Sequence, residues 1–119
     1  QSIYGDLDGL DQRCWHLSGR DGSEQLVAYA RLLAPGVKYP DAVAIGRVVV
    51  APDRRGGGLG RQLLQQAIRH CGQRYPGCAI MLSAQASLQH FYEEFSFVVQ
   101  SEPYDDGGIL HLDMRRHDA

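Results

Sequence analysis

The sequence predicts one α/β (α+β) domain, a mixed sheet of about six strands with two main helices. Residues 43–51 form an almost continuous apolar, β-branched run, which is typical of a central strand covered on both faces. Residues 59–71 repeat apolar side chains at helical spacing. A second apolar run follows at residues 78–83, and this order predicts a right-handed parallel crossover. A length of 119 residues fits a single domain, residues 1–119.

The segments before the crossover predict a loop and a hairpin. Residues 4–11 are acidic and interrupted by glycines, which favours a loop. Residues 14–18 and 24–33 are rich in apolar side chains and flank a turn, so they predict two antiparallel strands. Arg47 stands within the predicted central strand, where a cation needs a partner. We expect that partner to be an aspartate of residues 6–11 or an acidic group on a substrate.

The segments after the crossover predict a short helix and a second hairpin. Apolar residues recur at helical spacing over residues 88–95, and Ser87 is placed to cap that helix. Residues 97–102 and 109–115 predict strands around an Asp-Asp-Gly-Gly turn. Gly72 stands where the capping glycine of the first helix is expected.

The composition argues against nucleic-acid and membrane partners. Twelve basic and fourteen acidic residues give a net charge of -2, whereas a non-specific nucleic-acid binder is usually strongly basic. The apolar run at residues 43–51 is about half the length of a membrane helix. Residues 1–11 show neither the basic start nor the apolar block of a signal peptide.

The cysteines and acidic residues do not predict a metal site. Cys14, Cys71 and Cys78 are odd in number and far apart, which indicates reduced thiols and a cytoplasmic protein. Cys14 and His16 supply only half of a zinc site. The aspartates of residues 6–11 lack the glycine and glutamate that a calcium loop requires at fixed positions.

A glycine-rich loop, residues 55–60, separates the predicted central strand from the helix. Glycines let the backbone approach a ligand closely, and the first N–H groups of a helix have no acceptor inside it. The two features together predict a pyrophosphate cradle with Arg54, Arg55 and Arg61 at its rim. A solvated turn is the alternative. The loop fits neither the dinucleotide-binding motif nor the P-loop motif.

The spacing of Arg55, Gly58 and Gly60 resembles the pyrophosphate loop of the GCN5-related N-acetyltransferase (GNAT) family. Residues 48–50 resemble the family strand that pairs with the pantetheine arm of acetyl-CoA, and residues 88–97 resemble its late helix. More narrowly, residues 45–50, 83–86 and 91–92 are similar to the ElaA-like subgroup. The resemblance covers about residues 4–114.

The chain departs from the family pattern at four places. Ser96 stands where the family has a glycine at positive φ, which costs serine about 1 kcal/mol. Gln85 replaces an asparagine, and Leu88 replaces an alanine. Family members also carry a strand and one or two helices ahead of this point. The resemblance therefore implies a chain truncated at its N-terminus, with a longer gene product or a homodimer covering the gap.

The resemblance implies acetyl-CoA as co-substrate, without a metal, and a small-molecule or peptide amine as acceptor. Two splayed parallel strands, residues 43–51 and 78–83, would open a slot for pantetheine. The backbone N–H of Val48 or Val49 is then a candidate oxyanion donor. The expected cofactor-binding residues are Val48, Val49, Val50, Arg55, Gly56, Gly57, Gly58, Leu59, Gly60, Arg61 and Gln85.

Tyr92 is the candidate catalytic residue, as the general acid that protonates the leaving thiolate. Its spacing from Leu88 also permits a purely structural role in the core. The general base is open between His111, Glu102, His16 and a water chain. The predicted function is an acetyl-CoA-dependent N-acetyltransferase, an enzyme that acts by direct attack in a ternary complex. A GNAT-like module that binds acyl-CoA without turnover is the alternative.

Overall fold

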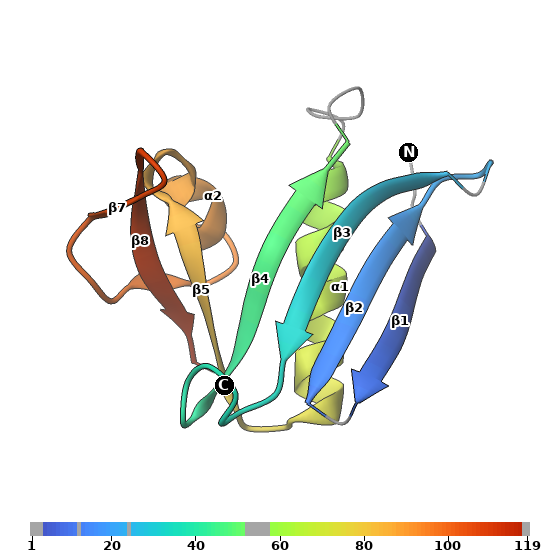
Figure 1. The fold of residues 1–119 in the computed structure, drawn as a ribbon, viewed down its shortest axis with the longest axis horizontal. Helices are drawn as coiled ribbons and strands as arrows, with labels where there is room; N and C mark the ends of the chain where they lie inside the picture. The colour runs from blue at the N-terminus through green and yellow to red at the C-terminus, as the bar shows by residue number, and fades with distance from the viewer. Residues whose placement is uncertain (1–3, 12, 24, 52–57, 118–119) are drawn as a thin grey trace.

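The computed structural model describes residues 4–11, 13–23, 25–51 and 58–117. Its strands form one sheet in the order β1-β2-β3-β4-β5-β8-β6, with β7 paired to β8 (Figure 1). The strands are β1 (Tyr4–Asp11), β2 (Cys14–Arg20), β3 (Leu26–Leu33), β4 (Ala42–Val50), β5 (Ala79–Gln85), β6 (Val98–Val99), β7 (Tyr104–Asp106) and β8 (Ile109–Arg116). The helices are α1 (Leu59–Arg74) and α2 (Gln89–Glu93), the latter preceded by the 3₁₀ turn η2 (Ala86–Leu88).

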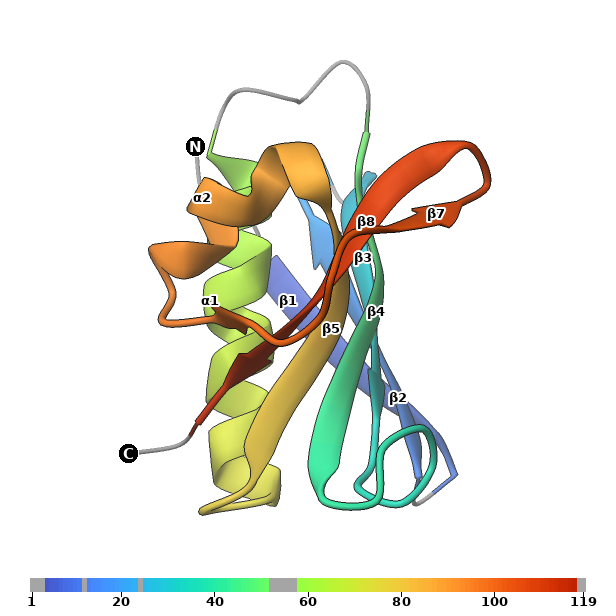
Figure 2. The ribbon, with the colours of Figure 1, turned by 90° about the vertical axis from the view of Figure 1, so that its left-hand side faces the viewer.

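Both helices cover the same face of the sheet, which we call the helix face (Figure 2). Strands β1 to β4 are antiparallel neighbours, β4 and β5 are parallel, and β8 returns antiparallel to β5. Helix α1 makes the crossover between β4 and β5. The predicted crossover and the mixed sheet are therefore confirmed, with eight strands in place of about six.

Helix α1 forms because its apolar residues share one side. The buried side chains are those of Leu59, Leu63, Leu64, Ala67 and Cys71, as the spacing predicts. The expected cap at Gly72 is wrong, since α1 continues to Arg74. Tyr75 caps it instead, donating its backbone N–H to the Cys71 carbonyl at 2.8 Å.

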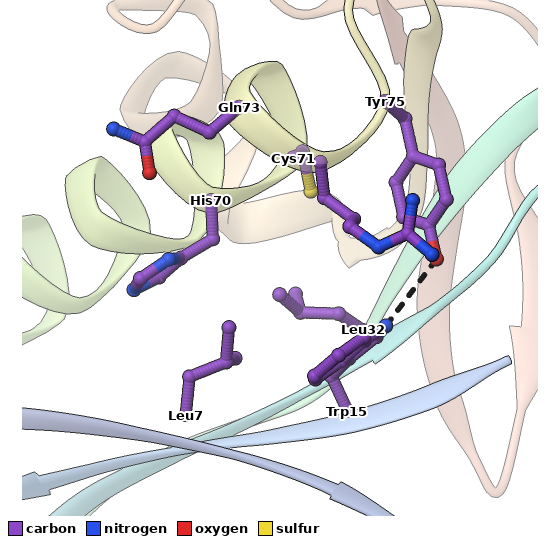
Figure 3. A pocket seen from close by; sticks show the side chains of 8 residues that line it. Leu7, Trp15, Leu32, His70, Cys71, Gln73 and Tyr75 are labelled. Atoms are coloured by element: carbon purple, nitrogen blue, oxygen red, sulfur yellow. Dashed lines mark hydrogen bonds between the residues drawn. The ribbon is translucent and has the colours of Figure 1, made fainter. Parts of the chain in front are cut away.

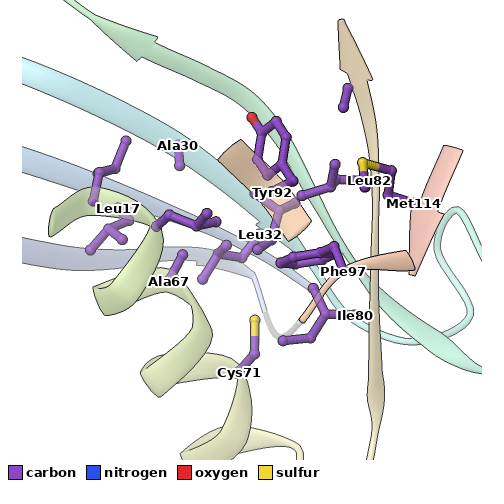
Figure 4. Packing of buried hydrophobic residues seen from close by; sticks show 14 of the residues in the cluster. Leu17, Ala30, Leu32, Ala67, Cys71, Ile80, Leu82, Tyr92, Phe97 and Met114 are labelled. Carbon is purple, nitrogen blue, oxygen red and sulfur yellow. The ribbon is translucent and has the colours of Figure 1, made fainter. Parts of the chain in front are cut away.

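The core lies between the helix face of the sheet and the two helices (Figure 4). Its largest fully buried side chains include Phe97, Leu17 and Met114, from three separate parts of the chain. Phe97 follows the turn after α2 and packs edge-on against Tyr92 at 6.0 Å between ring centroids. This contact fixes α2 against the sheet, since both rings are buried.

The expected loop at residues 4–11 is wrong, because this segment is strand β1. It pairs with β2 from Tyr4 opposite Arg20 to Gly9 opposite Trp15. A Cβ built on Gly9 would lie only 2.8 Å from Trp15 Cζ3, so the indole requires a glycine there. The backbone pairing offered by β2 outweighs the low strand propensity of aspartate and glycine.

The second predicted hairpin is also rearranged. Only Val98–Val99 of residues 97–102 pairs as a strand, while Asp105 and Asp106 belong to β7 rather than to a turn. The turn between β7 and β8 is Gly107–Gly108, with φ of 63° and 87°. Two consecutive positive φ values are what a tight two-residue hairpin requires, and glycine adopts them readily.

Ser87 lies within η2, and no side-chain cap hydrogen bond is found at the start of η2 or α2. That expectation is therefore wrong as well. The side chain of Arg47 is outside what the structure describes, so its expected pairing stays a prediction. Among the described residues, no helix is long and apolar enough to cross a membrane.

Candidate functional site

The two parallel strands separate part-way along their length. Their last register pair is Ile45 with Leu82, whereas β4 runs on to Val50 and β5 to Gln85. In Figure 1 the ends of β4 and β5 diverge above this point. The edge of β4 beyond Ile45 therefore faces a gap instead of a neighbouring strand.

An irregularity in β4 accompanies this separation. The register between β3 and β4 shifts between Tyr29, opposite Val49, and Arg31, opposite Gly46. Ile45, Val48 and Val50 all pack against the core, so the alternation of faces breaks once between residues 45 and 48. A β-bulge has this effect and bends the bulged strand. Val49 is left 51% exposed on the other face.

Helix α1 begins at the mouth of the gap. Its N-cap is Gly58, with φ of 82°, in the left-handed region that favours glycine. The Gln62 N–H donates to the Gly58 carbonyl at 3.1 Å, so the N–H groups before it have no acceptor inside the helix. Apart from its neighbours in the chain, no heavy atom of the described residues lies within 4 Å of a Cβ built on Gly58. This open, positive helix end has the properties of an anion site.

Arg61 holds the first turn of α1 against α2. Its Nη2 donates to Glu94 Oε2 at 3.1 Å. Its guanidinium also lies over the rings of Phe91 and Phe95, at 5.6 and 5.3 Å from their centroids. The arginine is thus positioned beside the start of α1, with its positive charge partly offset by the Glu94 carboxylate.

Two hollows meet in the gap. A groove of about 860 Å³ is lined by Val48, Val49, Val50, Gly58, Gly60, Arg61, Gln85, Leu88, Phe91 and Tyr92. A slot of about 210 Å³ is lined by Ile45, Gly46, Val48, Leu82, Ser83, Gln85, Leu88, Tyr92 and His111. Both are bordered by Tyr92, Val48, Gln85 and Leu88. The groove reaches the N-terminal end of α1. The slot passes between β4 and β5 toward Ser83 and His111.

Tyr92 stands where the groove meets the slot. It is only 6% exposed, and its ring packs edge-on against Phe91 and Phe97, at 5.2 and 6.0 Å. Its hydroxyl points away from the apolar cluster (Figure 4). Burial raises the pKa of Tyr92 above its ordinary value of 10.0. The phenol therefore stays protonated at neutral pH and can donate a proton.

Comparison with known proteins identifies the family. A model of the acetyltransferase (GNAT) domain matches residues 11–117. The chain belongs to the GNAT acetyltransferase family. Transfer of an acyl group from acyl-CoA is the general chemistry of this family.

Relatives place the chain in the ElaA-like branch of the GNAT family. It is 46% identical over 112 residues to the UPF0039 protein sll0451 of Synechocystis, covering 94% of this chain and 72% of that protein. It is similar to Escherichia coli ElaA, with 37% identity, a TM-score of 0.82, and coverage of 96% and 76% of the two chains. An acyl-CoA N-acyltransferase from Pseudomonas aeruginosa shows 41% identity, a TM-score of 0.82, and coverage of 92% and 73%.

The structure brings most of the expected GNAT cofactor residues to one groove. Val48, Val49, Val50, Gly58, Gly60, Arg61 and Gln85 all line it. Leu59 does not, because its side chain is 1% exposed and packs in the core. Arg55, Gly56 and Gly57 lie outside the described residues. Leu88 and Phe91 also line the groove, although neither was among the expected site residues. The position of Phe91 next to Tyr92 in the sequence could have indicated its role.

The three candidate general bases lie in different parts of the fold. His111 lines the slot. His16 lies on β2, where its Nδ1 contacts the Tyr29 hydroxyl, and β3 stands between β2 and β4. Glu102 is exposed between β6 and β7 and does not line the slot. Of these three residues, His111 alone borders the space that also contains Tyr92.

A further hollow of about 240 Å³ lies near the other end of α1 (Figure 3). Leu7, Trp15, Leu32 and Tyr75 contribute to its apolar lining, and Trp15 Nε1 donates to the Tyr75 hydroxyl at 3.3 Å. Burial lowers the pKa of His70 and raises that of Cys71 to about 12, so the Cys71 thiol keeps its proton at neutral pH and is a poor nucleophile. It is separate from the groove, with which it shares no lining residue.

Proposed function

We propose that this chain is an acetyl-CoA-dependent N-acetyltransferase that moves the acetyl group to a primary amine by direct attack in a ternary complex. The observation that carries the proposal is the junction at Tyr92. There a groove that starts at a helix N-terminus meets a slot through the sheet. This arrangement offers one approach for a long anionic donor and another for an acceptor.

The groove residues suit the parts of acetyl-CoA in order. The N–H groups at the start of α1, with Arg61 beside them, would hold the pyrophosphate. The edge of β4 beyond Ile45, which is not paired with β5, would pair with the amides of pantetheine through the backbone of Val48 and Val50. The thioester supplies the acetyl group, and the N–H of Val48 or Val49 is the proposed donor to the developing oxyanion.

Tyr92 and His111 are proposed to move the protons. The amine nitrogen forms a bond to the thioester carbonyl carbon, and the carbon–sulfur bond then breaks. Tyr92 donates its proton to the leaving sulfur, and a base takes one from the nitrogen. His111 Nδ1 lies 2.9 Å from the Ile109 carbonyl oxygen, which can only accept. The proton then sits on Nδ1, which leaves the Nε2 lone pair to accept the amine proton.

Two measurements test the proposal. CoA at a hundred times its dissociation constant should stabilise the fold by about 2.7 kcal/mol, seen as a higher melting temperature. Acetyl-CoA with a panel of primary amines should release free thiol. A melting curve unmoved by millimolar CoA would contradict the proposal. Stabilisation by CoA without thiol release from any amine would instead favour the non-catalytic module.

A further inference from the structure

The face of the sheet opposite the helices carries a polar cluster next to the slot, which we call the outer cluster: Tyr39, Ser83, Tyr104, His111 and Asp113. Ser83 and Asp113 are register partners on β5 and β8, so their side chains share a face. The Tyr104 hydroxyl lies 2.6 Å from Ser83 Oγ and 2.6 Å from Asp113 Oδ1. The ring of Tyr104 stacks on that of His111, at 6.3 Å between centroids.

Asp113 is a half-buried carboxyl group whose side chain is held by a hydrogen bond. Tyr104 donates to it, and Asp113 makes no ion pair within the described part of the chain. Its nearest basic neighbour on that face of β8, Arg115, pairs with Asp41 at 3.0 Å instead. Burial and the charge of Asp113 together raise the pKa of Tyr39, whose ring comes from the β3–β4 connection.

The position of Asp113 relates it to the slot. Ser83 and His111 both line the slot, and Asp113 follows His111 by two residues on β8, on the same face. Two residues along a strand span about 7 Å. A cation held at Asp113 would therefore lie about that far from the proposed base, beside the ring of Tyr104, which also attracts cations. The ring of Tyr39 already has a cation over it, since Lys38 Nζ lies 5.5 Å from its centroid.

We propose that Asp113 is a specificity-determining residue that selects acceptors with a second cationic group about 7 Å from the reacting amine, as in short aliphatic diamines. The inference rests on the proposed function, because it names the acceptor class of the same site. Asp113 does not touch the reacting atoms. Its carboxylate fixes one ammonium group while the other amine reaches His111 through the slot.

The kinetic test compares 1,4-diaminobutane with n-butylamine at saturating acetyl-CoA. Asp113→Asn removes the charge but keeps an oxygen that accepts from Tyr104, so β7 stays attached. Asp105→Asn is the matched control, because it removes the same charge from an exposed position on β7. We expect kcat/KM to favour the diamine by about tenfold in the parent chain and in Asp105→Asn. In Asp113→Asn the preference should fall to about the twofold advantage of having two amines, with butylamine unchanged.

Three results would overturn the inference. They are no diamine preference in the parent chain, a preference that survives in Asp113→Asn, and an equal loss for both amines in that variant. Butylamine turnover without diamine preference removes the inference alone and leaves the proposed function standing.

A binding measurement separates the inference from turnover. Melting curves are recorded with CoA and either 1,4-diaminobutane or n-butylamine at matched ionic strength. A stabilisation specific to the diamine and absent in Asp113→Asn supports the subsite, even where no thiol is released. Equal stabilisation of the parent chain and Asp113→Asn by the diamine contradicts it.

Discussion

Ile45 and Leu82 are the last residues at which β4 and β5 lie opposite each other in the sheet. Beyond this pair β4 bulges and keeps Val48 and Val50 on the helix face, while β5 leads into η2 and α2. The separation leaves backbone donors and acceptors of β4 unused by β5. It also brings the start of α1 and Tyr92 to the same groove.

The glycine at the start of α1 should be required for CoA binding. Gly58→Val places a branched side chain in the open space beside the helix N-terminus, so the CoA-induced rise in melting temperature should disappear. Gly36→Val is the matched control: its φ of 92° carries the same backbone penalty, and it lies in the β3–β4 connection. Both variants should melt earlier than the parent chain. An intact CoA shift in Gly58→Val would exclude this helix end as the pyrophosphate site.

Tyr92→Phe should lower the turnover number by about 10²–10⁴-fold, because general acid catalysis is typically worth that factor. The ring contacts to Phe91 and Phe97 remain, so stability and CoA affinity should change little. Tyr75→Phe, at the other end of α1, is the control that loses a phenol hydroxyl outside the groove. Steady-state kinetics and a CoA melting shift on the two variants give the comparison.

An acyl donor whose thiol leaves without protonation should restore much of the Tyr92→Phe rate. Because burial raises the pKa of Tyr92, loss of activity from its ionisation should occur at a higher pH than for a phenol with the ordinary pKa of 10.0. A rate for Tyr92→Phe equal to that of the parent chain with acetyl-CoA would assign Tyr92 to the core alone.

The parts of the fold that follow from periodicity were predictable. The apolar spacing along α1 and the β-branched run of β4 both report burial directly, and burial is what forms these elements. Strand β1 was not predictable, because Tyr4–Asp11 is held by its pairing with β2 and shows no apolar alternation. The same reason applies to β7, which is held by its pairing with β8.

The parts of the candidate site that consist of consecutive residues, the glycine loop and Val48–Val50, could be predicted from the sequence. The outer cluster was not, because Ser83 and Asp113 meet only through the pairing of β5 with β8. Tyr104 joins them from a strand that its local sequence does not predict. Register is a long-range property, so no local spacing indicates this contact.

The buried thiol of Cys71 should be inert in the folded chain. It is 3% exposed, and burial, with a smaller contribution from Cys78, raises its pKa to about 12. Iodoacetamide at pH 8 should label the half-buried Cys14 and Cys78 first, and Cys71 only after denaturation. Mass spectrometry of tryptic peptides gives the result, and equal labelling of all three thiols would contradict it.

The same shift predicts a loss of stability at alkaline pH. Below the ordinary thiol pKa of 9.0 both states keep the proton, and the contribution of Cys71 is constant. From there to about pH 12 the unfolded chain loses the proton and the folded chain does not, so stability falls as pH rises. The limiting slope is about 1.4 kcal/mol per pH unit. Urea unfolding between pH 8 and 10 should therefore show a shallower decline for Cys71→Ala than for the parent chain.

Ser96→Gly should stabilise the chain by about 1 kcal/mol, because Ser96 holds a φ of 70° in the left-handed region. This residue ends the turn after α2, and its N–H donates to the Glu93 carbonyl at 3.0 Å, so the backbone cannot relax without losing that bond. Ser96→Ala removes the same hydroxyl but keeps the Cβ that causes the strain. It should leave stability nearly unchanged. Urea unfolding that ranked the alanine variant equal to the glycine variant would show that the hydroxyl, rather than the backbone angle, is the source of the penalty.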